Sequence, residues 1–201
     1  MAKQRRVFVC RSCGAQAPAW TGQCTNCRGW ATIDEVAQAA SPTTATARTL
    51  DPLAGFDGST SVPNPVGLSE VDRVLGGGLV AGSVTLLSGE PGVGKSTLTL
   101  QVACSVAATG AGVVLVTGEE APSQVAARAA RMGDIPGSLM VLDDTAVDTI
   151  VSTLAAERPA VAIIDSIQTL RVPDVEASPG SVSQVREAAA RLVAVAKSSG
   201  T

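Results

Sequence analysis

Short apolar runs alternate with helical patterns along most of the chain, from about residue 63 onward. Each run is four to six residues long and is bounded by Gly, Asp or Pro, which is typical of buried strands. This alternation predicts an α/β fold built on a mostly parallel sheet. We expect its strands at residues 83–87, 112–117, 139–142 and 161–165. We expect its helices at residues 95–108, 123–132, 146–157 and 183–198.

The pattern before residue 63 is different and divides the chain into three zones. Residues 1–34 hold four of the five Cys and both Trp, which indicates a small separate module. Residues 35–62 are rich in Ala, Thr, Ser, Pro and Gly and are expected to form a flexible linker. Residues 63–201 form the expected α/β core. Its last helix reads as a crossover that should lead to another strand, so we expect the core to be incomplete at its C-terminal end; a helix that caps the sheet is the alternative.

The composition favours a core of aliphatic side chains. Hydrophobic residues make up 45% of the chain, but aromatic residues make up only 2% and Tyr is absent. The 201 residues suffice for one full domain and a small appended module. The chain has no His, which excludes His-based catalysis and His metal ligands.

Charge is distributed unevenly, although the net charge is only −3. A basic N-terminal module indicates a nucleic-acid partner, or alternatively a solubilising tail that balances the charge of a metal site. No apolar run approaches the roughly 20 residues of a membrane span and no secretory signal is evident, so we expect a cytoplasmic protein without a membrane partner. The basic residues that precede Asp34, the first acidic residue, are Lys3, Arg5, Arg6, Arg11 and Arg28.

A glycine-rich segment lies between the first expected strand and the first expected helix. It matches the phosphate-binding pattern G-x-x-x-x-G-K-[ST], the P-loop, at every fixed position. Glycines let the backbone wrap around a phosphate, and the N–H groups at a helix N-terminus attract its charge; a turn that only caps the helix is the alternative. We expect Lys95 to neutralise the β- and γ-phosphates, Ser96 to ligate Mg²⁺ and Thr97 to lie near the α-phosphate. The residues of the pattern are Gly89, Glu90, Pro91, Gly92, Val93, Gly94, Lys95 and Ser96.

Carboxylates follow two of the expected strands. Asp165 ends the apolar run 161–165, and we expect it to hold Mg²⁺ through water. Glu119 and Glu120 follow the strand expected at 112–117; either could orient and deprotonate the attacking water, and we favour Glu119. Gln168 could sense the γ-phosphate or make a simple loop hydrogen bond. No Asn-Lys-x-Asp guanine motif is present, which favours ATP over GTP.

Four cysteines form two CxxC pairs separated by ten residues. Tetrahedral Zn²⁺ takes four thiolates, and each CxxC turn presents two of them to one point. The pattern therefore predicts a structural zinc ribbon, with redox pairs or disulfides as alternatives. We expect Trp20, Trp30 and Phe8 to form the small core around the metal, and Cys104 to be a core residue of the α/β domain. The expected zinc ligands are Cys10, Cys13, Cys24 and Cys27.

Several motifs together carry a resemblance to a known family. The four-Cys module reads Cys10-x-x-Cys13-Gly14 and then Pro18-x-Trp20-x-Gly22-x-Cys24-x-x-Cys27-x-x-Trp30. The other motifs are residues 67–80 before the P-loop, Gly118-Glu119-Glu120, residues 165–169 and residues 179–187. With these motifs the chain resembles the bacterial RadA (Sms) family of DNA-repair ATPases over nearly its whole length except the linker.

The resemblance implies a RecA-like P-loop core and a DNA-dependent ATPase in recombinational repair. It implies binding of single-stranded and branched DNA, branch migration of recombination intermediates, and a hexameric ring that acts with RecA recombinase or other repair proteins at the nucleoid. In such folds the segment 171–183 can face DNA, so Arg171 and Arg186 would contact phosphates; a plain surface loop is the alternative. Ala121 replaces the Ser that usually follows the paired Glu in the family. A regulatory RecA-like ATPase whose zinc module binds a protein is the second function that we consider.

Overall fold

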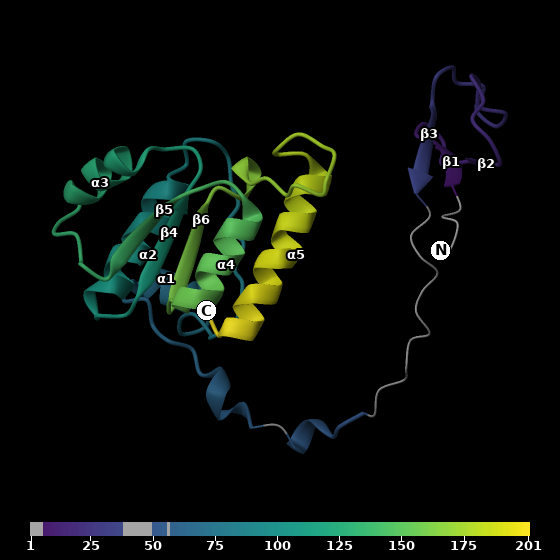
Figure 1. Cartoon of the computed structure of the whole chain (residues 1–201). Helices are drawn as coiled ribbons and strands as arrows, with labels where there is room; N and C mark the ends of the chain where they lie inside the picture. The colour runs from purple at the N-terminus through teal and green to yellow at the C-terminus, as the bar shows by residue number, and fades with distance from the viewer. Residues whose placement is uncertain (1–5, 38–49, 56) are drawn as a thin grey trace. The chain divides into compact units, whose positions relative to one another are not determined.

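The computed structural model describes residues 6–37, 50–55 and 57–201 and divides the chain into two compact units, Met1–Gly55 and Phe56–Thr201 (Figure 1). Each unit has its own hydrophobic core. Two groups of expected residues lie outside the described ranges: Lys3 and Arg5 of the basic N-terminal module, and residues 38–49 of the expected linker. The described linker residues include two short 3₁₀ helices, η1 (Leu53–Gly55) and η2 (Gly58–Ser61).

The N-terminal unit is a small antiparallel sheet. Its central strand β1 (Arg6–Cys10) pairs with β2 (Gln16–Ala17) on one side and with β3 (Ile33–Ala37) on the other. Two of the cysteines fill the interior of this unit and leave little room for other side chains. The buried residues are Cys10, Cys24 and Ile33, with Phe8 and Ala15 packed against them.

The two tryptophans of this unit lie on its surface. Trp20 is 62% exposed and Trp30 is 73% exposed, so the prediction that they form the core of the ribbon was wrong. The physical reason is volume: the inward-facing cysteines and Ile33 already fill the interior of so short a module. Phe8 alone of the three expected aromatic residues packs against that interior.

The C-terminal unit has three layers, with a parallel sheet of order β5-β4-β6 between α1, α2 and α3 on one face and α4 and α5 on the other (Figure 1). The strands are β4 (Val113–Thr117), β5 (Leu139–Asp143) and β6 (Val161–Asp165). The helices are α1 (Ser69–Val74), α2 (Lys95–Ala108), α3 (Pro122–Ala130), α4 (Val147–Glu157) and α5 (Val182–Ser199), with a 3₁₀ turn η3 (Ile167–Thr169) after β6.

Central strand β4 is buried on both faces, as expected from its run of four apolar residues before Thr117. Val113 and Leu115 face α2 and α3, whereas Val114 and Val116 face α4 and α5. Successive side chains of a strand point to opposite faces, so this one strand anchors both outer layers. The carboxyl end of β4 is thereby fixed from both sides.

The structure confirms three of the four expected strands and all four expected helices to within a few residues. Helix α3 begins at Pro122, one residue earlier than expected, since Pro suits the first helical position. The strand expected at 83–87 was wrong: within residues 57–201 no strand forms hydrogen bonds with this segment, and Val84, Leu86 and Leu87 are exposed. An extended segment becomes a strand only when a neighbour completes its hydrogen-bond ladder.

No helix in the described ranges is long and apolar enough to cross a membrane.

Candidate functional site

The glycine-rich segment 89–94 leads directly into α2. Gly92 has φ 79° and Gly94, the residue before the helix, has φ 101°. Both angles lie in the left-handed region that side chains disfavour, so these two positions require glycine. The first amides of α2 have no partner within the helix and offer hydrogen-bond donors to an anion at this end.

Lys95 begins α2 and its side chain folds back over the loop. Its Nζ donates to the carbonyl oxygens of Gly89 and Glu90, each at 2.9 Å. The ammonium group is thereby held at the mouth of the helix, where the dipole of the helix also favours negative charge. The loop and Lys95 together can hold a polyphosphate.

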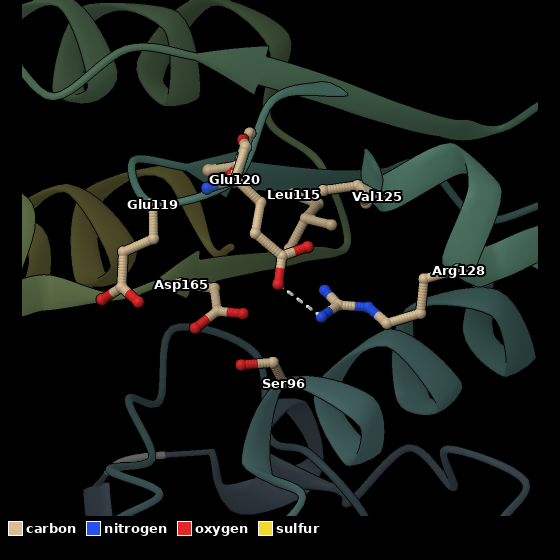
Figure 2. A pocket seen from close by; sticks show the side chains of 8 residues that line it. Ser96, Leu115, Glu119, Glu120, Val125, Arg128 and Asp165 are labelled. Carbon is tan, nitrogen blue, oxygen red and sulfur yellow. Dashed lines mark hydrogen bonds and ion pairs between the residues drawn. The ribbon is translucent and has the colours of Figure 1, made fainter. Parts of the chain in front are cut away.

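A small pocket lies at the carboxyl edge of the sheet, between β4, β6 and the first turn of α2 (Figure 2). It brings together Ser96, Glu119 and Asp165, three residues that the sequence assigned to one site. Thr97 and Gln168 are exposed and are not among the residues that line the pocket. The lining residues are Ser96, Leu115, Thr117, Glu119, Glu120, Val125, Arg128 and Asp165.

Strand register explains why distant carboxylates meet here. Thr117 at the end of β4 pairs with Asp165 at the end of β6, and the Gly118 amide donates to the Asp165 carbonyl at 3.2 Å. Glu119 therefore lies beside Asp165 although the two are far apart in sequence. The Ser96 hydroxyl and the Asp165 carboxylate are oxygen donors of the kind that Mg²⁺ prefers, so the pocket has the chemistry of a Mg²⁺ site.

The sequence assigned no role to two further residues of the site, Ser166 and Arg128. The Ser166 hydroxyl donates to Oε1 of Glu119 at 2.6 Å, and Nη1 of Arg128 donates to Oε1 of Glu120 at 2.7 Å. Arg128 lies on α3, eight residues from its partner, and no spacing rule connects them. Ser166 had a weak signal, because it directly follows Asp165 at the functional edge of the sheet.

The four cysteines of the CxxC pairs lie with their sulfur atoms within 4.8 Å of one another. Cys10 and Cys27 Sγ are 3.6 Å apart, and Cys13 and Cys24 Sγ are 3.7 Å apart. A tetrahedron with Zn–S bonds of about 2.3 Å has S···S edges of about 3.8 Å. The separations therefore fit four ligands of one ion and exclude disulfide bonds, and the module is a four-Cys zinc site.

Contacts within the cluster shift the pKa values of Cys10 and Cys27 in opposite directions. The contact with Thr32, at 3.3 Å from Sγ, lowers the pKa of Cys10 to about 6. The Gly29 amide lowers the pKa of Cys27, but the neighbouring thiols Cys13 and Cys10 outweigh it and raise that pKa to about 12. Crowded thiols resist losing a further proton, and a dication at their centre removes this resistance.

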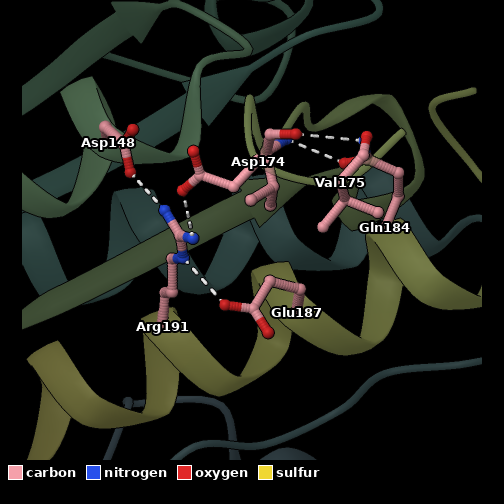
Figure 3. Close-up of polar contacts among 7 residues, drawn as sticks. Asp148, Asp174, Val175, Gln184, Glu187 and Arg191 are labelled. Atoms are coloured by element: carbon pink, nitrogen blue, oxygen red, sulfur yellow. Dashed lines mark hydrogen bonds and ion pairs between the residues drawn. The ribbon is translucent and has the colours of Figure 1, made fainter. Parts of the chain in front are cut away.

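The loop between η3 and α5 is fixed by two side chains of α5 (Figure 3). Gln184 is 1% exposed, and its side chain makes four hydrogen bonds to the backbone of residues 172–177. Arg191 contacts three carboxylates, which raise its pKa. These carboxylates are Glu187 at 3.0 Å, Asp148 at 2.6 Å and Asp174 at 3.1 Å.

Arg171 and Arg186, the basic residues expected to contact DNA, are both exposed. They flank a loop that is anchored to α5 and packed through the buried Val172. Cys104 packs against the cluster of Leu100 and Leu115 and is partly buried, and this burial raises its pKa.

Comparison with known proteins assigns a family to each unit. The family model described as "AAA domain" matches residues 64–200, and the one described as "Rubredoxin metal binding domain" matches residues 8–35. Together these ranges include the four cysteines of the CxxC pairs and every helix and strand from α1 to α5.

Curated relatives with the name "DNA repair protein RadA" align with nearly the entire chain. The protein from Salmonella typhimurium is 45% identical over 208 residues, which cover 98% of this chain and 45% of the relative. Those from Pseudomonas aeruginosa and Bacillus subtilis are 43% and 39% identical, and each alignment covers 100% of this chain and 46% of the relative. The chain thus spans about half the length of the curated relatives it matches. The expected resemblance is confirmed: the chain belongs to the AAA domain family and, within it, to the bacterial RadA proteins.

Proposed function

We propose that this chain carries the ATP site of a DNA-dependent ATPase that acts in recombinational DNA repair. The observation that carries the proposal is the pocket of Figure 2, in which Ser96, Glu119 and Asp165 meet beside the P-loop. A phosphate-binding loop, oxygen ligands for a cation and a carboxylate to accept the proton of water are the parts that phosphoryl transfer to water requires.

In the proposed site, residues 89–94 and Lys95 bind the β- and γ-phosphates through backbone amides and the ammonium group. Ser96 and Asp165 would hold Mg²⁺, which neutralises charge on the phosphates when bound. Thr97, one residue further along α2, would lie near the α-phosphate. Gln168, exposed on η3, is available to contact the γ-phosphate.

Hydrolysis in this proposal uses Glu119 as the general base. The water oxygen forms a bond to the γ-phosphorus, and Glu119 accepts the proton that the water loses. The bond from the γ-phosphorus to the bridging oxygen breaks, and its electron pair stays on ADP. Lys95 stabilises the charge that develops on the phosphate oxygens.

The DNA part of the proposal rests on the relatives and on surface charge. Proteins named for DNA repair match the chain along nearly its whole length. Exposed Arg171 and Arg186 beside an anchored loop suit the sugar-phosphate backbone of single-stranded or branched DNA. The proposal further includes branch migration, a hexameric ring and cooperation with RecA recombinase or other repair proteins. It also includes a cytoplasmic, nucleoid-associated location.

The test is the rate of ATP hydrolysis with and without single-stranded DNA. We expect DNA to stimulate ATP turnover. We expect Lys95→Ala to abolish ATP turnover, because the phosphates lose the ammonium group that neutralises their charge. Lys197→Ala, at an exposed position on α5, is the matched control and should retain the wild-type rate. Equal rates in Lys95→Ala and wild type would refute the ATP site, and a rate that DNA does not change would refute the DNA-dependent function.

One observation favours the second function, a regulatory ATPase whose zinc module binds a protein. Trp20 and Trp30 are exposed on the zinc ribbon, and exposed Trp is characteristic of protein-binding surfaces. ATP turnover that responds to a protein partner and not to DNA would favour this function over the first.

A further inference from the structure

The two adjacent glutamates of the pocket have different partners. Oε1 of Glu119 accepts a hydrogen bond from Ser166 at 2.6 Å, whereas Oε1 of Glu120 accepts one from Arg128 at 2.7 Å. Figure 2 shows the two side chains diverging, with Glu120 directed to α3 and Glu119 lying on the other side of Asp165. Adjacent carboxylates of the same chemistry are thus held in different positions.

Glu120 is fixed by both its side chain and its backbone. The side chain of its partner Arg128 is only 18% exposed, so the ion pair is shielded from much of the solvent. The Thr117 hydroxyl also donates to the Glu120 carbonyl at 2.6 Å and accepts from its amide at 3.3 Å. The ion pair and the Thr117 contacts thereby hold the Glu120 carboxylate in a position directed to α3 (Figure 2).

Glu119 has a neutral partner in place of a cation. The Ser166 hydroxyl contacts one carboxylate oxygen, and none of the ion pairs found among the described residues includes Glu119. Ser166 is placed for this contact by register, since Asp165 ends β6 opposite Thr117, the last residue of β4. A single hydrogen bond of this kind limits how the carboxylate can rotate, and one oxygen stays available to a water molecule.

We propose that Ser166 is a positioning residue for Glu119, and that the ion pair between Arg128 and Glu120 keeps the second carboxylate away from the attacking water. This inference rests on the proposed ATPase function. Ser166 does not itself react: Glu119 takes the proton of the water, and the hydroxyl of Ser166 holds the acceptor in the required orientation. The expected consequence is a loss of turnover without a loss of nucleotide affinity.

The test compares Ser166→Ala with Ser166→Thr in the full chain. We expect Ser166→Ala to lower kcat by about tenfold or more. A general base accelerates the reaction by a factor of about 10²–10⁴, and a base that can rotate away from the water loses part of this factor. KM for ATP and the Kd of a fluorescent ATP analogue with Mg²⁺ should stay within about twofold of the wild-type values. The substitution does not change the contacts that bind ATP equally in the ground state and the transition state. Ser166→Thr keeps the hydroxyl and should restore most of kcat.

Two carboxamide variants test how the two carboxylates are assigned. Glu119→Gln should lose about 100-fold or more in kcat, whereas Glu120→Gln should lose far less and mainly weaken the contact with Arg128. Wild-type kcat in Ser166→Ala, a parallel loss of nucleotide affinity, no rescue by Ser166→Thr, or a larger effect of Glu120→Gln would each overturn the inference. A wild-type chain that neither binds nor hydrolyses ATP would instead overturn the proposed function together with it.

Discussion

Gln184 allows a stability prediction that can be worked from individual hydrogen bonds. Its Oε1 accepts from the Val172 amide at 2.8 Å, and its Nε2 donates to the carbonyls of Val172, Val175 and Ala177 at 3.1, 2.9 and 3.0 Å. Gln184→Leu conserves the volume of the side chain and removes all four contacts. The substitution therefore tests the polar contacts and leaves no cavity.

The magnitude depends on which backbone groups lose all their partners. The Val172 and Val175 carbonyls keep bonds from the amides of Val175 at 3.3 Å and Ala177 at 2.8 Å. The Val172 amide and the Ala177 carbonyl lose their partners, and each buried unsatisfied group costs about 1–3 kcal/mol. Ala177 is only partly buried and can turn toward water, so we expect a total loss of about 2–4 kcal/mol in the free energy of unfolding.

Urea denaturation followed by far-UV circular dichroism measures this loss. Tryptophan fluorescence is unsuitable, because both Trp lie in the zinc ribbon and report only on that unit. Gln101→Leu, at an exposed position of α2, is the matched control and should change stability by less than about 0.5 kcal/mol. A Gln184→Leu chain as stable as this control would refute the reasoning.

Two further predictions address the metal site and the approach to the P-loop. Cys24→Ser should lower bound zinc, measured by elemental analysis, from about one ion per chain to none. The same change at Cys104 is the control and should leave zinc bound. Zinc retained by Cys24→Ser would contradict the ligand assignment. Gly78 has φ 135° and a Cβ there would collide with the carbonyl oxygen of Asn64, so Gly78→Ala should lower Tm. Gly76, at φ 71°, has open space around it and serves as the control. Gly76→Ala should lower the free energy of unfolding by only about 1–2 kcal/mol, which is roughly 2–8 °C in Tm. Equal losses of Tm at both positions would exclude the collision at Gly78.

Sequence patterns predicted the elements of this fold well where burial alone defines them. Strand β4 is apolar at four of its five positions because both of its faces are covered, and that pattern is visible without a structure. Residues 83–87 carry a similar pattern but form no strand within the described residues, since pairing depends on a neighbour that periodicity does not show. The tryptophans were misplaced for a related reason: hydrophobicity indicates that a side chain can be buried, but the volume of the module decides whether it is.

In the candidate site, too, local sequence patterns predicted some features and not others. The glycine-rich turn that leads into α2 could be predicted, because it depends on consecutive residues and on two glycines with left-handed backbone angles. The meeting of Glu119 with Ser166 could not be predicted, because it depends on β6 being the neighbour of β4 in the register that sets Thr117 opposite Asp165. A shift of that register by one residue would turn the side chains at the end of β6 to the opposite face and remove the contact. In the proposed mechanism, strand order, which no local pattern encodes, therefore decides which of the two adjacent glutamates Ser166 holds as the proton acceptor.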